Sequence, residues 1–202
     1  MSVFEGLEHV RIIGEGAFST VSEYRSREFG GTLAVKRLKA SHAKNEEYVQ
    51  RFRREVELLR ALAGTPYIVD LIDADLEGPV LRYAMPRART NLAGLLRARN
   101  NQLELTDRLA LFEQVLAGMK AAHAKQILHR DLAPSNVLVF GTEDSVQLAI
   151  AAFGLGKSLA DIQSATRSSV ASLGQLYFVA PERIRRGVSA LQGATASPSN
   201  AI

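Results

Sequence analysis

Apolar and polar positions follow two different spacings in the first ninety residues. Five short apolar runs bounded by glycine, proline or charged residues predict β-strands: 10–14, 20–25, 32–36, 67–73 and 79–85. From Asn45 to about Ala63, apolar residues instead recur every three or four positions, which predicts one long helix with a buried stripe. The first part of the chain is therefore expected to form five strands and one helix.

Helical spacing dominates the next stretch. Leucines after the potential caps Thr90 and Asn91 predict a short helix, and a longer one is expected from a cap at Thr106 to about Lys125. We expect one face of the longer helix to fill the core, through Leu109, Phe112, Leu116, Met119 and Ala122. Val146–Ile150 predicts a further strand.

Composition narrows the possible functions only a little. With 202 residues, of which 47% are hydrophobic, the chain can bury a substantial core. It has no cysteine, which excludes disulfides and thiolate metal sites. Lysine and arginine exceed acidic residues by 25 − 21 = 4, which suits phosphate handling and does not itself indicate nucleic acid. No signal peptide or membrane-spanning run is recognisable, so we expect a cytoplasmic protein without membrane contact.

The strongest chemical signal is the stretch Ile127–Phe140, ILHRDLAPSNVLVF. Asp131 is suited to accept a proton from a substrate hydroxyl. Asn136, five residues later, offers an amide oxygen of the kind that hard cations such as Mg²⁺ bind. This pairing, on a loop between short apolar runs, points to phosphoryl transfer.

Weaker signals precede this loop. Gly14 and Gly16 lie between two predicted strands, where glycine allows backbone N–H groups to approach a phosphate, although an ordinary hairpin has the same appearance. Lys36 ends the third strand, and alone it reads equally well as a solvated residue. Glu55 lies on or beside the buried stripe of the helix, where it either reaches water or meets a cation such as Lys36.

Together these segments resemble the eukaryotic-type (Hanks-type) serine/threonine protein kinase domain. The matching motifs are H-R-D-L-x-x-x-N at 129–136, a glycine-rich loop at 14–21 with Ser19 at the third glycine, Ala-Val-Lys at 34–36 and Ala-Pro-Glu at 180–182. The resemblance implies an α+β, bilobal kinase-like fold. Residues 1–88 would form a small lobe of five antiparallel strands and one helix, with the hinge, and 89–186 a partial, mainly helical large lobe.

The same resemblance assigns roles to individual residues. Lys36 would reach the ATP phosphates and pair with Glu55, Asp131 would act as the base, and Asn136 would bind Mg²⁺. The remaining positions implied to bind ATP are Gly14, Gly16, Ser19, Val21, Ala34, Met85, Ala88 and Leu138. For Val21, Ala34 and Leu138, ordinary core packing is the alternative explanation.

Two departures bear on activity. Ala152 stands where the family's Asp-Phe-Gly aspartate holds Mg²⁺, and a methyl group cannot ligate that cation. In the family, a lysine or an arginine at the position of Ala133 or Ser135 steadies the transferred phosphoryl group, and this chain has neither. Arg87 or Arg89 could supply that positive charge instead. We therefore expect an impaired protein kinase, or alternatively a nucleotide-binding pseudokinase that serves as a scaffold or regulatory module. A small-molecule kinase is a more distant alternative.

The family pattern ends after Glu182. Residues 155–179 resemble an activation segment with candidate phosphosites Thr166, Ser168 and Ser169, and the small polar residues 187–202 predict a disordered tail. Lack of the later large-lobe helices would leave apolar surface exposed. The expected partners are thus ATP and a protein substrate, together with a partner chain that completes the lobe or forms a homodimer.

Overall fold

The computed structural model describes residues 2–27, 30–143 and 145–153. The predicted activation segment, its phosphosites, the Ala-Pro-Glu motif and the predicted tail all lie outside these residues. Within them, no helix has the length and apolar character needed to cross a bilayer.

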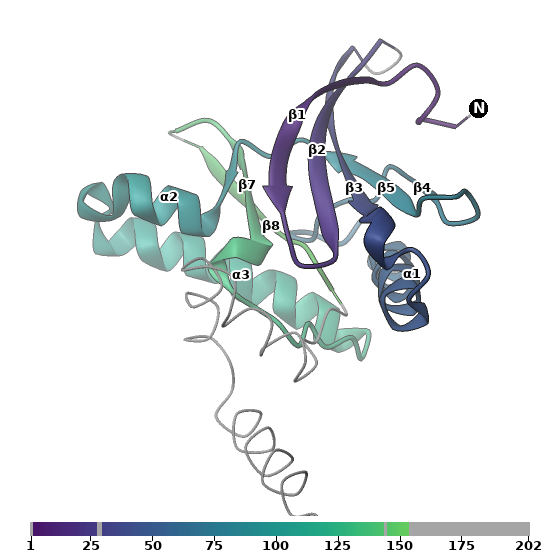
Figure 1. The fold of residues 1–202 in the computed structure, drawn as a ribbon. Coiled ribbons are helices and arrows are strands. Elements are labelled where there is room, and N and C mark those ends of the chain that lie inside the picture. The colour runs from purple at the N-terminus through teal and green to yellow at the C-terminus, as the bar shows by residue number, and fades with distance from the viewer. Residues whose placement is uncertain (1, 28–29, 144, 154–202) are drawn as a thin grey trace, which may run out of the picture. The chain divides into compact units, whose positions relative to one another are not determined.

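A five-stranded antiparallel sheet forms the first half of the fold (Figure 1). Its strands are β1 (Glu8–Glu15), β2 (Ser19–Ser26), β3 (Gly31–Leu38), β5 (Arg82–Pro86) and β4 (Asp73–Asp75), in that spatial order. The sheet confirms the predicted small-lobe architecture. Register places Lys36 of β3 between Val21 of β2 and Tyr83 of β5.

The strand predicted over 67–73 is wrong in extent, because β4 begins only at Asp73. Ile68 instead forms an isolated parallel bridge with Ile150, and Val69 N donates to Ile150 O at 3.0 Å. Ile68 and Val69 are consecutive and both buried, which is unlike the alternation of a half-buried strand. This buried run therefore joins the five-stranded sheet to the rest of the fold.

Helix α1 (Glu46–Ala61) contacts β3, and Asn45 caps its N-terminus by accepting from Glu47 N and Tyr48 N. Its buried residues are Phe52, Glu55, Val56 and Leu59. Three of the four are apolar and spaced as the sequence predicted. Burial of Glu55 beside them means that its carboxylate must be satisfied inside the protein.

The second half contains α2 (Leu92–Arg99), α3 (Leu105–Ala124) and a small sheet of β6 (Thr90–Asn91), β7 (Val137–Gly141) and β8 (Val146–Ile150). Short 3-10 helices η1 (Ala40–His42), η2 (Asn100–Gln102) and η3 (Pro134–Asn136) complete the described elements. Asn91 caps α2 by accepting from Gly94 N, as predicted.

Helix α3 departs from prediction in two respects. It begins at Leu105 and is capped by Glu104 rather than Thr106, because Glu104 and Asp107 form a reciprocal capping box. Leu109, Phe112 and Leu116 were expected in the core, but all three are exposed. Of the five predicted core residues, Ala122 is buried and Met119 packs against the core. The side of α3 that faces β8 also buries Leu111 and Gly118, and the small residues Gly118 and Ala122 allow close approach of the helix to the sheet.

Candidate nucleotide and phosphoryl-transfer site

Lys36 and Glu55 form a buried ion pair. Lys36 Nζ donates to Glu55 Oε1 at 2.7 Å and to Oε2 at 2.8 Å, and the two side chains are 8% and 0% exposed. Strand β3 supplies the ammonium and α1 the carboxylate, so the pair ties the helix to the sheet. Of the two alternatives that the helical stripe left open, the structure shows the cation partner, because burial leaves this carboxylate in need of one.

Two aromatic residues surround this pair, and sequence reasoning gave neither a role. Tyr83 Oη donates to Glu55 Oε1 at 2.9 Å, and its ring centroid lies 5.8 Å from Lys36 Nζ. Phe18, next to the glycines of the β1–β2 hairpin, lies 5.9 Å from the same ammonium and stacks on Tyr48 of α1. The hairpin, the sheet and α1 thus meet at Lys36.

Asp131 and Asn136 are held together on the loop before β7. Asn136 Nδ2 donates to Asp131 O at 2.7 Å and to Asp131 Oδ2 at 3.2 Å. The main-chain oxygen of Asn136 also accepts from Ala151 N at 2.9 Å, which ties the loop to the residue after β8. Because its nitrogen is turned toward Asp131, the amide oxygen of Asn136 points the other way.

His129 links this loop to β8 and to Phe153. It is buried, its Nε2 lies 2.7 Å from Ala151 O, and its Nδ1 accepts from Asp131 N at 3.3 Å. Burial lowers the pKa of His129, opposed by the Ala151 carbonyl and by the charges of Asp131 and Glu55. His129 therefore holds the loop against the end of β8 and against Phe153.

Four of the residues assigned to the adenine site belong to one large hydrophobic cluster. Ala34 and Met85 are buried members of it, and Val21 of β2 and Leu138 of β7 are partly buried and pack against the cluster. Ala88, after β5, is also buried. Residues from both halves of the fold thus contribute to this cluster.

The β1–β2 hairpin does not itself require its glycines. Neither Gly14 nor Gly16 has a positive φ, and a Cβ at Gly16 would lie 3.6 Å from Ser19 O, an ordinary contact. Gly16 N donates to Ser19 O at 2.8 Å, and Ser19 is buried.

Comparison with known proteins decides the family. Residues 7–195 match the protein kinase domain. This chain belongs to the protein kinase family. The chain is 31% identical over 191 residues to a probable serine/threonine-protein kinase, PknA2, of Bifidobacterium longum, covering 91% of this chain and 24% of that protein. It is 27% identical over 180 residues to the serine/threonine-protein kinase PrkC of Bacillus subtilis, covering 89% of this chain and 27% of that protein.

Solved structures agree with this assignment. The kinase domain of Mycobacterium tuberculosis PknI superposes with a TM-score of 0.60 at 28% identity, covering 76% of this chain and 62% of that chain. The present chain spans about a quarter of the length of the two bacterial relatives named above. Members of the family use ATP and Mg²⁺ to phosphorylate proteins.

Ala152 occupies the position that the resemblance assigns to a metal-binding aspartate, between buried Ala151 and buried Phe153. Phe153 is fully buried, and its ring lies 4.7 Å from that of His129. Ala152 has φ 62°, a left-handed conformation that asparagine and aspartate adopt more readily than alanine. In the described ranges, no three acidic, histidine or cysteine side chains come together to hold a metal ion. Asn136 alone is a poor fit for Mg²⁺, which favours carboxylate ligands.

Among the described residues, neither Arg87 nor Arg89 forms a hydrogen bond or ion pair with the loop that carries Asp131. Arg87 Nε donates to Glu23 Oε2 at 3.1 Å. Arg89 Nη1 donates to Gly141 O at 2.9 Å, in the turn between β7 and β8. Both guanidinium groups are therefore committed to other partners.

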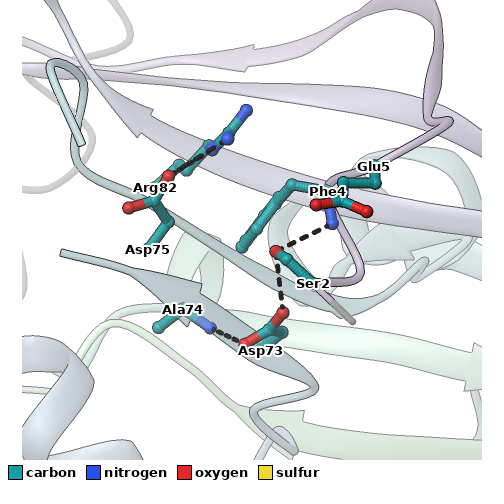
Figure 2. Close-up of a pocket in the computed structure, with 7 residues that line it drawn as sticks. All are labelled: Ser2, Phe4, Glu5, Asp73, Ala74, Asp75 and Arg82. Atoms are coloured by element: carbon teal, nitrogen blue, oxygen red, sulfur yellow. Dashed lines mark hydrogen bonds and ion pairs between the residues drawn. The ribbon is translucent and has the colours of Figure 1, made fainter. Parts of the chain in front are cut away.

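Two hollows of the described part lie elsewhere. One of about 580 Å³ is lined by Ser2, Phe4, Glu5, Asp73, Ala74, Asp75 and Arg82 (Figure 2). Phe4 packs against Val35 and Ala84, the neighbours of Lys36 and Tyr83, so this hollow lies on the opposite face of the sheet. The other, of about 440 Å³, is lined by residues including Tyr67, Gln114 and Phe140. Neither includes a predicted catalytic residue.

Proposed function

We propose that this chain binds ATP and transfers its γ-phosphoryl group to a serine or threonine hydroxyl of a protein, with turnover reduced by Ala152. Lys36, oriented by Glu55, would hold the phosphates, and Asp131 would accept the hydroxyl proton. Gly14, Gly16 and Ser19 would cover the phosphates, and the cluster around Ala34 and Met85 would take the base.

The observations that carry this proposal are the buried Lys36–Glu55 pair and an Asp131 that is fixed by Asn136. A buried ion pair is weak support for a stabilising role alone, since apolar residues of similar volume often serve stability as well. Lysine has three N–H donors, and Glu55 takes two of them at 2.7 and 2.8 Å. The third is suited to a phosphate oxygen.

The decisive experiment is Ala152→Asp, with Ala152→Asn as the matched control. Both side chains suit the left-handed backbone at this position, but only aspartate adds a charged oxygen ligand. We expect transfer of labelled phosphoryl from ATP to casein, or to the chain itself, to rise by at least ~10²–10³ in Ala152→Asp and much less in Ala152→Asn. If the folded aspartate variant shows no rise, Ala152 is not what limits turnover.

A nucleotide-binding scaffold is the second candidate, favoured by the exposed apolar row Leu105, Leu109, Phe112 and Leu116 on α3. Such a protein would bind ATP and a partner chain, or a second copy, without turnover even as Ala152→Asp. ATP at 100 times its Kd should raise the free energy of unfolding by about 2.7 kcal/mol. Both candidate functions require ATP binding, so a thermal-shift titration in which ATP does not change the melting temperature would refute both.

A further inference from the structure

Tyr83 is one of the most deeply buried side chains in the described part of the protein. It is 1% exposed, yet its hydroxyl is polar and reaches Glu55 Oε1 at 2.9 Å. Burial and then the negative charge of Glu55 raise the pKa of Tyr83, so the hydroxyl keeps its proton and acts as the donor. The ring also packs on Phe52, one turn before Glu55 on α1, at 5.6 Å between centroids.

Glu55 needs this hydroxyl for a physical reason. Its carboxylate is fully buried, and the donors that the structure gives it are Lys36 Nζ and Tyr83 Oη. A buried acceptor is destabilised by the cost of its desolvation to the extent that its donors are removed. Without the hydroxyl, Oε1 would depend on Lys36 alone.

The hydroxyl also fixes geometry. Lys36, Glu55 and Tyr83 come from β3, α1 and β5, and the Cα atoms of Lys36 and Tyr83 face each other in register. Glu55 is therefore held from two adjacent strands. Anchoring the carboxylate from the second strand determines the direction in which Lys36 presents its remaining N–H.

We propose that Tyr83 is a positioning residue for nucleotide binding, holding Glu55 so that Lys36 is aimed at the phosphates of ATP. The inference rests on the proposed function, because it assumes that ATP binds at Lys36. Tyr83 touches no phosphate in this scheme and acts only through Glu55. Simple core filling, the competing explanation, needs the ring but not the hydroxyl.

Tyr83→Phe separates the two explanations, because it keeps the ring and removes only the donor. We expect its affinity for ATP, measured by titration calorimetry on the full chain, to fall by about 5- to 30-fold. Tyr24→Phe is the matched control, because the Tyr24 hydroxyl accepts from Arg37 Nη1 at 3.4 Å and forms no hydrogen bond with Glu55 in the described part of the chain. That variant should bind ATP as the parent does.

A double-mutant cycle tests the route through Glu55. In a Glu55→Met background, Tyr83→Phe should bring little further loss of ATP affinity, because the acceptor is gone. An unchanged affinity in Tyr83→Phe overturns the proposal. So does a loss of equal size in the Glu55→Met background.

If the parent chain does not bind ATP, the proposed function is refuted. Amide hydrogen exchange then still tests whether Tyr83 positions Glu55. The comparison then uses α1 (Glu46–Ala61) in the unliganded proteins. Exchange faster by about 5-fold or more in Tyr83→Phe, but not in Tyr24→Phe, supports positioning of Glu55 by Tyr83. Unchanged exchange in α1 overturns it.

Discussion

Removing the ammonium of Lys36 offers the sharpest test of how the site is built. Lys36→Met keeps most of the side-chain volume but leaves the Glu55 carboxylate, 0% exposed, without its cation. Breaking a buried pair from one side typically costs about 3–5 kcal/mol. Whole domains are stable by only about 5–15 kcal/mol, so this loss should dominate the unfolding curve.

The companion variants show where the cost arises. Replacing both charges, as in Lys36→Met with Glu55→Leu, should recover much of the lost stability, since apolar residues substitute well for buried pairs. The Tyr83 hydroxyl would then lack its acceptor, which costs about 1–3 kcal/mol. Adding Tyr83→Phe should therefore restore near-parental stability while ATP binding stays absent.

Urea unfolding followed by circular dichroism measures these differences. Arg54→Met is the control, because Arg54 and Glu57 form a 3.6 Å pair with side chains 65% and 60% exposed. Exposed pairs contribute less than about 1 kcal/mol. If Lys36→Met is as mild as Arg54→Met, the burial argument for this pair is refuted.

Two further predictions concern stability. The pKa of His129 lies below the ordinary 6.5, so the unfolded chain takes up a proton that the folded chain excludes, and stability should fall as the pH drops below 6.5. As the pH is lowered, the urea midpoint of His129→Gln should fall less than that of the parent, and the midpoint of His123→Gln should fall as much as that of the parent. Equal falls in the parent and both variants contradict the assignment to His129. The second prediction concerns the N-terminus of α1: Asn45→Ala removes the side chain that accepts from Glu47 N and Tyr48 N, and should lower the free energy of unfolding by about 1 kcal/mol, whereas Asn101→Ala, at an exposed position, should leave it unchanged. A loss below the error of the measurement would show that this cap is dispensable.

Several features followed directly from local sequence. Helix α1 was expected over 45–63 and is found at Glu46–Ala61, because its apolar residues keep a helical period and Asn45 caps it. The same stripe left open whether Glu55 reaches water or meets a cation, and the structure shows that it is buried and paired with Lys36. Motif spacing also anticipated the proximity of Asp131 and Asn136, which are joined by a short loop.

Other features depended on contacts between distant segments. The partner of the Tyr83 hydroxyl could not be read from an apolar run, since it comes from α1, 28 residues away in sequence. The predicted core face of α3 was wrong for Leu109, Phe112 and Leu116, because helical period identifies an apolar stripe but not the surface that covers it. Residues 67–69 likewise join Ile150 of β8 rather than extending β4.

The sequence by itself thus determined the elements, their order and the chemistry of the motifs, since these depend on periodicity and on residue type at fixed spacing. Tertiary structure alone decided which buried hydroxyl supports Glu55, which side of α3 meets β8, and that Arg87 and Arg89 bind partners away from the catalytic loop. The physical reason is that burial and hydrogen-bond partners arise from segments far apart in the chain. Local patterns carry no record of those segments.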